Sequence, residues 1–521
     1  MGRRSWKISW RIFWIIILFI ILSLAFSLIV PVFNAPDEPY HFEYIRFLAE
    51  HRKLPNQTVA ELSLTTEGFN PPLYYLIGAI PLALLSRDNA SDIGIHTGQD
   101  LMDFACNPEA EFNKRIFPPL NPAYIKLGRG KERNMFLTTD QDRFPFSGSI
   151  RVIHLIRMIS IVFGALTVLF VFKTADALFP DRKNIALLAA SLCAFNPQFT
   201  FLSGVLNNDN LVVLFSTLSL YLLTRFILSE RDKPKLKWLL GLGTTIGLGL
   251  ISKVNISFLV VISGLGLIYQ AMSMPGASGT AGASGTAGAS GRSCGRDWGL
   301  KQKLAGAIRN LVLLLIPIAA ISGWFFVRNV SLFGLDDPLG WKLQAIQNPE
   351  LVMPSQIRTQ FITRFLGPRL FTSFWGQFDW LTIRLPAWAY WIYGLISLMG
   401  LVGAVVFPAG VGGGRKGGKK SKAQRRAGKV TVCLLLYLAA IFLAITNIVI
   451  LDLSFFSDQG RLIFPVIAPL CIFMSSGLVS GFTMLSRLLK TGVSLFVYSF
   501  ILLLIGLNVY SLIAVVYPIY R

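Results

Sequence analysis

The stretch that decides the fold is "WRIFWIIILFIILSLAFSLIVPVF", residues 10–33, in which no charged side chain occurs from Ile12 to Phe33. A helix of about 20 residues crosses the hydrocarbon core of a bilayer, so this run is long enough to span it. The run is also longer than the apolar core of a signal peptide, about 7–15 residues, and no small-x-small cleavage site follows it. Residues 10–33 therefore predict a membrane-spanning helix that is not removed.

The composition of the whole chain is that of a membrane protein. Of the 521 residues, 53% are hydrophobic and 15% are charged, whereas a soluble protein carries about 25% charged residues. We expect an all-α polytopic membrane protein of about eleven transmembrane helices. The predicted spans lie at about 10–33, 150–173, 184–206, 209–229, 236–252, 254–273, 307–327, 386–408, 430–451, 462–484 and 491–517.

The distribution of Lys and Arg predicts the orientation. The N-terminal "MGRRSWK" is basic, and basic short loops stay on the cytoplasmic side. Alternating spans then place "PDRKN", "SERDKPKLK", the 274–306 loop, the 409–429 loop and "SRLLK" on that side. All five predicted inner loops are net positive, which supports a cytoplasmic N-terminus in the cell membrane.

The acidic residues gather on the predicted extracytoplasmic side, which carries 22 of the 27 Asp and Glu residues. The net charge of +22 is therefore a sign of topology and of attraction to anionic lipid. It does not predict a nucleic-acid partner. Five cysteines show no spacing typical of a disulfide framework or a metal site.

The predicted organisation has seven segments. They are a first transmembrane helix (1–33), a large extracytoplasmic loop (34–149), helices two to six (150–273), a cytoplasmic Gly/Ala/Ser linker (274–306), helix seven (307–327), a second large extracytoplasmic loop (328–385) and helices eight to eleven (386–521). The linker composition cannot build a core. In the first loop, the apolar segment 70–85 is too short for an untilted span and predicts a juxtamembrane helix.

The first loop opens with "NAPDEPYHFEYIRF", residues 34–47, directly after the apolar run. Asp37 before Pro39 is typical of a capped helix start, which is the structural interpretation. The functional interpretation is that one carboxylate of Asp37 and Glu38 is a general base, because partial desolvation at the membrane edge raises its basicity. His41 follows at helical spacing, so Glu38 and His41 are also candidate ligands of a divalent cation, although they do not complete a coordination shell.

A second acid and three cations fall on the same predicted face. Asp209 lies in "LNNDN" between two spans, where it is either a solvated turn residue or a second acid of the cavity. Lys253, Arg328 and Arg461 lie at the outer ends of spans. Each is suited to anchoring a helix at the interface or to binding an anionic head group, and Arg binds phosphate oxygens in pairs.

Aromatic side chains surround a glycine in "TSFWGQFDW", residues 372–380. They indicate an aromatic belt at the interface or, alternatively, a surface on which Trp375 and Trp380 stack against a sugar or a prenyl chain. Tyr40 and His41 of the first loop are further candidate substrate contacts.

Read in order, these motifs resemble the GT-C superfamily of membrane glycosyltransferases, which includes the protein O-mannosyltransferases and the aminoarabinose transferase of lipid A. The order is "PDEPYH", "NPPLYYL", the Arg-led span from "RMISIVFGAL" to "AFNP", "NNDN", the "SK" turn, "GWFFVRN" and "QGR". The match covers spans one to about ten. "SFWGQFDW" and "QGRLIFP" look closest to a bacterial, largely uncharacterised branch.

The resemblance implies an inverting transferase that moves a sugar from a polyprenyl-phosphate donor to an acceptor hydroxyl on the extracytoplasmic side. It implies that Asp37 is the base, that Glu38 orients it or binds a metal, and that Asp209 is the second acid. Lys253, Arg328 and Arg461 would hold the donor phosphate. Many members of the superfamily have another residue in place of His41, and some carry a large soluble C-terminal domain that this sequence lacks, which leaves the acceptor open as a glycan, a lipid or a protein.

Other classes of protein remain as alternatives. A transporter or flippase of lipid-linked glycans would place ionisable residues at the bilayer midplane and would often show internal repeats, which are not seen here. A glycan polymerase or ligase would share the outer arginines but would not need the early Asp-Glu motif. A non-enzymatic scaffold would need none of the carboxylates.

Overall fold

The computed structural model describes residues 10–58, 64, 66–85, 144–229, 236–273, 300–347, 352, 354–406, 422–455 and 459–520. Most of the predicted first loop, the Gly/Ala/Ser linker and the basic part of the 409–429 loop lie outside these ranges. The description that follows concerns the described residues.

Within the described ranges the chain is almost entirely helical, which confirms the all-α class. The long apolar helices are α1 (Trp10–Ile29), α6 (Gly148–Leu178), α9 (Asp209–Leu228), α10 (Leu236–Leu250), α11 (Phe258–Met272), α12 (Leu300–Phe333), α16 (Ala387–Val406), α17 (Lys422–Asp452), α18 (Ile467–Leu488) and α19 (Val493–Tyr510). The shorter helices are α2 (Glu38–His51), α3 (Leu73–Leu85), α7 (Lys183–Ala194), α8 (Pro197–Ser203), α13 (Trp341–Gln347), α14 (Ser355–Gln360), α15 (Gly367–Trp375) and α20 (Tyr517–Tyr520).

Short 3-10 and π-helical segments and one hairpin complete the described part of the chain. The 3-10 turns are η1 (Thr66–Phe69), η4 (Val254–Ile256) and η7 (Gly460–Val466), and η6 (Phe361–Leu366) and η8 (Ser511–Val516) are π-helical. Strands β1 (Gln377–Phe378) and β2 (Ile383–Arg384) pair antiparallel, with Gln377 opposite Arg384.

All eleven predicted spans coincide with apolar helices, so a multi-pass membrane protein is confirmed. Within the described ranges, eight helices are long and apolar enough to cross a membrane, or nine if α7 and α8 form one span bent by 62°. The bend falls at Asn196-Pro197, where the Asn196 side chain accepts a hydrogen bond from Phe199 N and starts α8. Because α10 and α16 are shorter, the count of about eleven is compatible with the structure without being fully confirmed.

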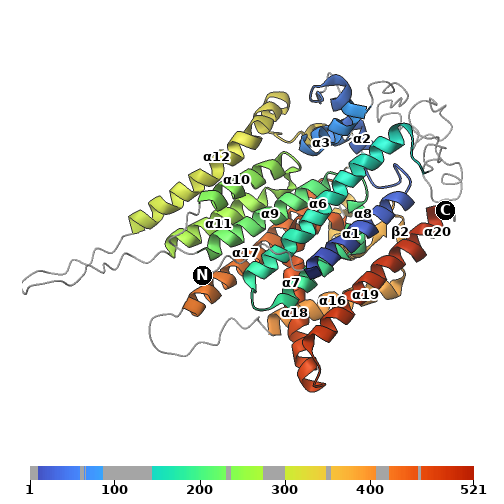
Figure 1. Ribbon diagram of the computed structural model, residues 1–521. Helices are drawn as coiled ribbons and strands as arrows, with labels where there is room; N and C mark the ends of the chain where they lie inside the picture. Colours follow the sequence, from blue (N-terminus) through green and yellow to red (C-terminus); the bar gives the residue numbers. More distant parts are fainter. Residues whose placement is uncertain are drawn as a thin grey trace, which may run out of the picture.

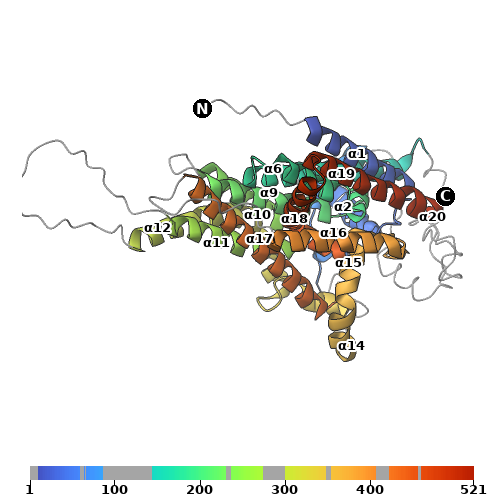
Figure 2. The same ribbon diagram turned by 90° about the horizontal axis from the view of Figure 1, so that it is seen from below.

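The helices form an elongated bundle (Figure 1). The segment Gly460–Leu488 lies at its centre, with 78% of its most apolar window buried, whereas α12 and α17 have 28% buried. Figure 1 shows α12 at one edge of the bundle beside α10. Seen from below, α14 and α15 project to one side of α16 (Figure 2).

Glycines bring α10 and α12 into backbone contact. A Cβ on Gly243 would lie 2.5 Å from Leu314 O, and one on Gly247 would lie 3.1 Å from the Cβ of Ile321. Small residues four positions apart allow helices in a membrane to approach closely and to gain van der Waals contact. The "GLGTTIGLGL" sequence is therefore explained by helix packing.

Helices α2 and α3 lie together at one end of the bundle, beside the start of α6 (Figure 1). Leu73 N donates to Ile251 O at 2.9 Å, which attaches the start of α3 to the end of α10. Buried aromatic residues, among them Phe42, Tyr44 and Tyr74, form a separate small core under these helices. This end of the bundle carries the polar residues that the sequence singles out.

Candidate active site

Asp37 lies at the N-cap position of α2 in a left-handed backbone conformation, with φ of 63°. Pro39 occupies the first turn, as expected for a helix start, but the Asp37 side chain makes no capping hydrogen bond. The Asp37 carboxylate instead pairs with Arg461, which comes 424 positions later in the chain. The side chain of Asp37 remains 27% exposed, so this carboxylate is reachable from solvent.

Glu38 takes a different direction from Asp37 and joins a buried network. Its two oxygens accept hydrogen bonds from Arg157 Nε at 2.8 Å and Nη2 at 2.6 Å. They also accept from the backbone amides of Phe33, at 2.8 Å, and Leu206, at 2.9 Å. Both side chains of the Glu38–Arg157 pair are completely buried.

Arg157 binds the end of α1 with its remaining donors. Its Nη1 donates to Ser27 O and Val30 O, both at 2.8 Å, and Nη2 donates to Pro31 O at 3.2 Å. A guanidinium has five N–H donors, and all five are used here. The pair therefore ties α1 and α6 to the start of α2 and to the segment just before Asp209.

The second acid lies close to the first through a shared cation. Arg461 Nε lies 3.6 Å from Asp209 Oδ2, while Arg461 Nη2 contacts Asp37. Lys253 Nζ donates to Asp209 Oδ1 at 2.5 Å and lies 3.5 Å from Asn208 Oδ1. The result is a row of alternating charges, Asp37, Arg461, Asp209 and Lys253, which we call the charge row.

A second group of polar side chains lies next to the charge row. Tyr75 OH donates to Glu67 Oε2 at 2.7 Å, and the His41 ring nitrogen Nδ1 lies 3.0 Å from Tyr75 OH and 3.3 Å from Glu67 Oε2. Asn208 Nδ2 donates to Tyr75 OH at 3.1 Å, which links this group to the row. Because Asn208 precedes Asp209 in the chain, both groups share one backbone segment.

The electrostatics of Glu67 show how strongly the two groups interact. Burial alone would raise the pKa of this carboxyl, but the charge and hydrogen bond of His41, the charge of Lys253 and the Tyr75 hydroxyl outweigh it. The pKa of Glu67 is thereby lowered from 4.5 to about 2. Burial raises the pKa of Tyr75 well above its ordinary value, so the hydroxyl stays protonated and donates.

Several polar atoms of the site have no hydrogen-bond partner within the described part of the chain. They are Arg461 Nε and Nη1, Asp209 Oδ2 and His41 Nε2, and each is buried. An unpaired buried polar atom costs free energy, about 1–3 kcal/mol, and more on a charged group. Arg461 Nε and Asp209 Oδ2 lie 3.6 Å apart and face each other, so Arg461 Nη1 and His41 Nε2 are the two atoms of this set that are suited to receive groups of a ligand.

Gly460 explains why Arg461 reaches the charge row. A Cβ on Gly460 would collide with the backbone of α15 at Leu370 and Phe374. Its amide donates to Ser373 Oγ at 2.7 Å. The glycine lets η7 lie directly against α15, and this contact sets the position of the next residue, Arg461.

Of the three predicted cations, the structure brings two into the charge row. Arg328, at the end of α12, instead donates from Nη2 to Pro55 O at 2.5 Å. In the described ranges no ion pair joins Arg328 to Asp37 or Asp209. Arg328 therefore contacts the segment after α2 and lies outside the charge row.

The two tryptophans predicted to stack against a substrate differ in their surroundings. Trp375 is 2% exposed and stacks on Tyr393 with ring centroids 4.4 Å apart, so it packs in the core and does not offer a free face. Trp380 meets Tyr40 edge to face, with centroids 6.3 Å apart, and its indole nitrogen has no hydrogen-bond partner in the described residues. Tyr40 belongs to α2, three positions from Asp37, so this aromatic pair lies beside the motif.

The predicted metal ligands do not come together. Glu38 is saturated by Arg157 and two amides, and His41 faces Glu67 and Tyr75. No group of three His, Cys, Asp or Glu side chains suited to a metal occurs among the described residues. The role of Glu38 and His41 as metal ligands stays a prediction, and the structure shows Glu38 bound to Arg157.

The sequence interpretation missed four residues of this site: Glu67, Tyr75, Asn208 and Arg157. Tyr75 and Asn208 lie inside the motifs "NPPLYYL" and "NNDN", which drew attention as motifs and not for these side chains. Glu67 stands three positions before the first motif, in "TTEGFNPP", and only the tertiary structure brings it to His41. Arg157 was visible as a charge inside a span, which is a functional signal by default.

Comparison with known proteins was made for sequence and structure. The family model described as "Dolichyl-phosphate-mannose-protein mannosyltransferase" matches residues 150–275, about a quarter of the chain. No curated protein sequence matches. The matched region covers α6 to α11, including Arg157, Asp209 and Lys253.

The solved structures of three proteins are similar over most of this chain. ArnT from Cupriavidus metallidurans bound to undecaprenyl phosphate is 12% identical, with a TM-score of 0.44, and the match covers 89% of this chain and 59% of ArnT. The oligosaccharyltransferase AglB from Archaeoglobus fulgidus is 14% identical, with a TM-score of 0.44 and coverages of 99% and 56%. The O-mannosyltransferase Pmt1-Pmt2 of S. cerevisiae is 16% identical, with a TM-score of 0.38 and coverages of 63% and 35%.

The chain thus spans less than two thirds of the length of each of these proteins. The family model matches a region that holds several of the motifs on which the resemblance rests, among them "NNDN" and the "SK" turn.

Proposed function

We propose that this protein is a membrane glycosyltransferase that moves a sugar from a polyprenyl-phosphate donor to an acceptor hydroxyl on the extracytoplasmic side, with inversion at the anomeric carbon. The observation that carries the proposal is the charge row, in which a reachable carboxylate, Asp37, contacts a guanidinium whose Nη1 has no hydrogen-bond partner among the described residues. A base for the acceptor and an anchor for the donor phosphate thus lie side by side.

Each residue of the row has a role in this reaction. Asp37 accepts the proton of the acceptor hydroxyl while the hydroxyl oxygen attacks the anomeric carbon. The bond from that carbon to the phosphate oxygen breaks, and the phosphate leaves with the electron pair. Arg461 and Lys253 stabilise the charge on the leaving phosphate, and Asp209 lies within 4 Å of both cations and orients them.

The neighbouring groups supply further contacts. His41 and Glu67 hold Tyr75, which supports Asn208 beside Lys253. Trp380 and Tyr40 offer an aromatic pair with an unpaired indole N–H near the acidic motif, suited to a sugar ring. The transferred sugar is a hexosyl or pentosyl unit, and its acceptor is a glycan, a lipid or a protein.

The position of the charge row favours a transferase over a transporter or flippase. Asp37 precedes α2, Asp209 begins α9, Lys253 follows α10 and Arg461 precedes α18, so all four stand at helix ends. A transporter concentrates such groups at the bilayer midplane. A polymerase or ligase of diphosphate-linked glycans is the second enzyme class compatible with outer cations, but it leaves the Asp37 contact without a role.

The orientation expected from the basic loops completes the proposal. The charge row lies at the end of the bundle where α1 ends and α9 begins. With a cytoplasmic N-terminus this end is extracytoplasmic, the side on which a lipid-linked donor would meet an exported acceptor.

The test is a turnover assay with purified protein in lipid. A panel of polyprenyl-phosphate sugars is supplied, and release of polyprenyl phosphate is followed for wild type, Asp37→Asn and the control Asp336→Asn. Asp336 is an exposed acid that pairs with Lys342 outside the site. We expect release by wild type and control only, and an Asp37→Asn protein that turns over at the wild-type rate would remove Asp37 as the base.

A further inference from the structure

A second candidate site lies at the other end of the bundle, away from the charge row. A cavity of about 1240 Å³ opens where the α6–α7 turn meets the α18–α19 turn. Helix α18 begins six residues after Arg461, and the part of it that lines the cavity starts at Val479, 12 residues further on, or about 18 Å at 1.5 Å per residue. The cavity therefore cannot belong to the donor site.

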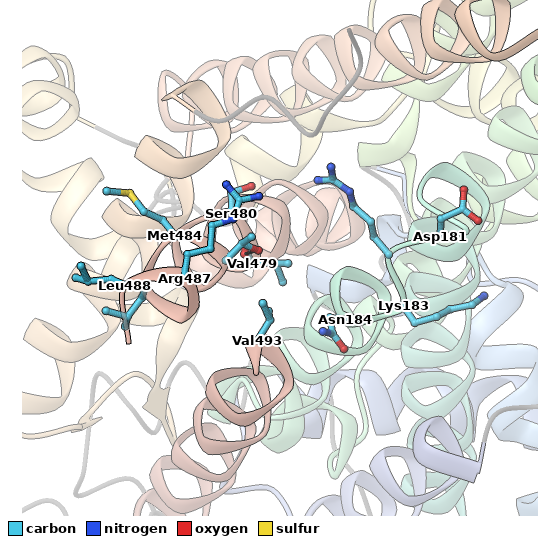
Figure 3. A pocket seen from close by; sticks show the side chains of 13 residues that line it. Asp181, Lys183, Asn184, Val479, Ser480, Met484, Arg487, Leu488 and Val493 are labelled. Atoms are coloured by element: carbon cyan, nitrogen blue, oxygen red, sulfur yellow. Dashed lines mark hydrogen bonds between the residues drawn. The ribbon is translucent and has the colours of Figure 1, made fainter. Parts of the chain in front are cut away.

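Cations line one part of this cavity. Arg182, Lys183 and Arg487 contribute to its wall, against a single acid among the lining residues, Asp181. Figure 3 labels Lys183, Arg487 and Asp181. Lys183 is paired with Asp176 and is 56% exposed. The side chains of Arg182 and Arg487 make no hydrogen bond or ion pair within the described part of the chain, so both guanidinium groups are available to an anion.

Apolar side chains line the rest. Met484 is 64% exposed and Leu488 is 77% exposed, and both belong to the last two turns of α18 (Figure 3). Val493, at the start of α19, lies between the labelled residues of α18 and those of α7 (Figure 3). A purely polar ligand would leave these apolar surfaces uncovered, and a purely apolar one would leave the arginines unpaired.

We propose that this cavity binds an anionic phospholipid, with its phosphate between Arg182 and Arg487 and its acyl chains against Met484 and Leu488. The cavity lies where spans α6, α7, α18 and α19 end or begin, which is the level of the lipid head groups. A basic pocket between transmembrane helices is suited to such a head group. By the charge of its loops, this end faces the cytoplasmic leaflet.

The experiment measures lipid binding to the purified full chain in a neutral detergent. Phosphatidylglycerol and phosphatidylcholine are titrated, and bound lipid is counted by native mass spectrometry beside the thermal midpoint. The double variant Arg182→Gln/Arg487→Gln should bind phosphatidylglycerol roughly 30-fold more weakly, equivalent to about 2 kcal/mol. Arg309→Gln, which removes an exposed arginine of α12, is the matched control and should leave binding unchanged.

A second variant separates loss of the site from loss of the fold. A Cβ on Gly481, which lines the cavity, meets no atom within 4 Å, so Gly481→Leu fills the cavity without disturbing the helix. Gly506→Leu, equally open but on α19 away from the cavity, is its control. We expect Gly481→Leu alone to lower phosphatidylglycerol binding, with no fall in the thermal midpoint of the lipid-free protein.

Three results would overturn the proposal. Unchanged phosphatidylglycerol binding in the arginine double variant would remove the head-group contact. Equal affinity for phosphatidylcholine would leave only an apolar groove. If inorganic phosphate raised the thermal midpoint as much as the lipid does, the two arginines would be a binding site for a free anion and not for a lipid head group.

Discussion

The buried Glu38–Arg157 pair should contribute more to the stability of this protein than any exposed ion pair. In Arg157→Met the Glu38 carboxylate keeps only its two backbone amides, and three carbonyls at the end of α1 lose their donor. Both charged groups are completely buried. Removing one partner of a buried pair costs about 3–5 kcal/mol, because the remaining charge stays uncompensated.

The assay is reversible unfolding in mixed micelles, followed by tryptophan fluorescence as a denaturing detergent is added. We expect Arg157→Met to lower the free energy of unfolding by about 3–5 kcal/mol. Glu38→Gln should also cost about 3–5 kcal/mol, because the buried Arg157 loses its counter-charge and the new amide NH2 faces two hydrogen-bond donors. The double variant should be less destabilised than the sum of the singles, by at least about 1 kcal/mol, because no lone charge remains.

Lys342→Met is the control for the loss of any lysine or arginine pair. Lys342 and Asp336 are 64% and 75% exposed, and we expect no measurable change in stability. The reasoning would be refuted if Arg157→Met were as stable as this control. It would also be refuted if the losses of unfolding free energy in the two single variants added up to the loss in the double variant. The network would then be a set of contacts that water or relaxation can replace.

Three further predictions concern the site and its support. Gly460→Ala should push η7 from α15 and misplace Arg461, so donor affinity measured by calorimetry should fall at least about tenfold while the protein remains folded; unchanged affinity would contradict the positioning role. The pKa of Glu67 is lowered from 4.5 to about 2, so its contribution to stability is present above pH 4.5 and is lost as the pH falls through about 2. Glu67→Gln should therefore lower the free energy of unfolding by up to about 3 kcal/mol at neutral pH. As the pH falls between these two values, the thermal midpoint of wild type should approach that of the variant. A difference in thermal midpoint that does not depend on pH would contradict this role of Glu67. Gly243→Leu should separate α10 from α12 and destabilise the protein by about 1–3 kcal/mol in the same unfolding assay. Gly323→Leu, at a position with open space, is the control and should not destabilise it. Equal effects of the two variants would contradict the close contact.

The sequence was sufficient to predict the spans because hydrophobic runs report burial in lipid without any need for tertiary detail. All eleven predicted runs are helices, and even the break between α7 and α8 was marked by Asn196-Pro197. Helix ends were less visible, since the boundary of a span depends on neighbours as well as on composition. The length of α10 is one example, for it ends where it meets α3.

The site could be predicted only in part because ion pairs join residues hundreds of positions apart. Asp37 and Asp209 were recognisable as acids at helix ends, but nothing local shows that Arg461 lies between them. The different surroundings of Asp37 and Glu38 could not be predicted for the same reason. Two adjacent carboxylates look alike in a sequence, and only the structure shows that one faces Arg157 in the interior while the other remains reachable.

The contact between Asp37 and Arg461 gives a physical reason for the order of the charge row. A cation that binds a phosphate needs donors that are not already used. Arg461 meets this condition while it contacts both acids, since Nη2 contacts Asp37 and Nε lies 3.6 Å from Asp209 Oδ2, whereas Nη1 keeps no hydrogen-bond partner among the described residues. One guanidinium can then hold the leaving phosphate and the base at the same time, on different edges.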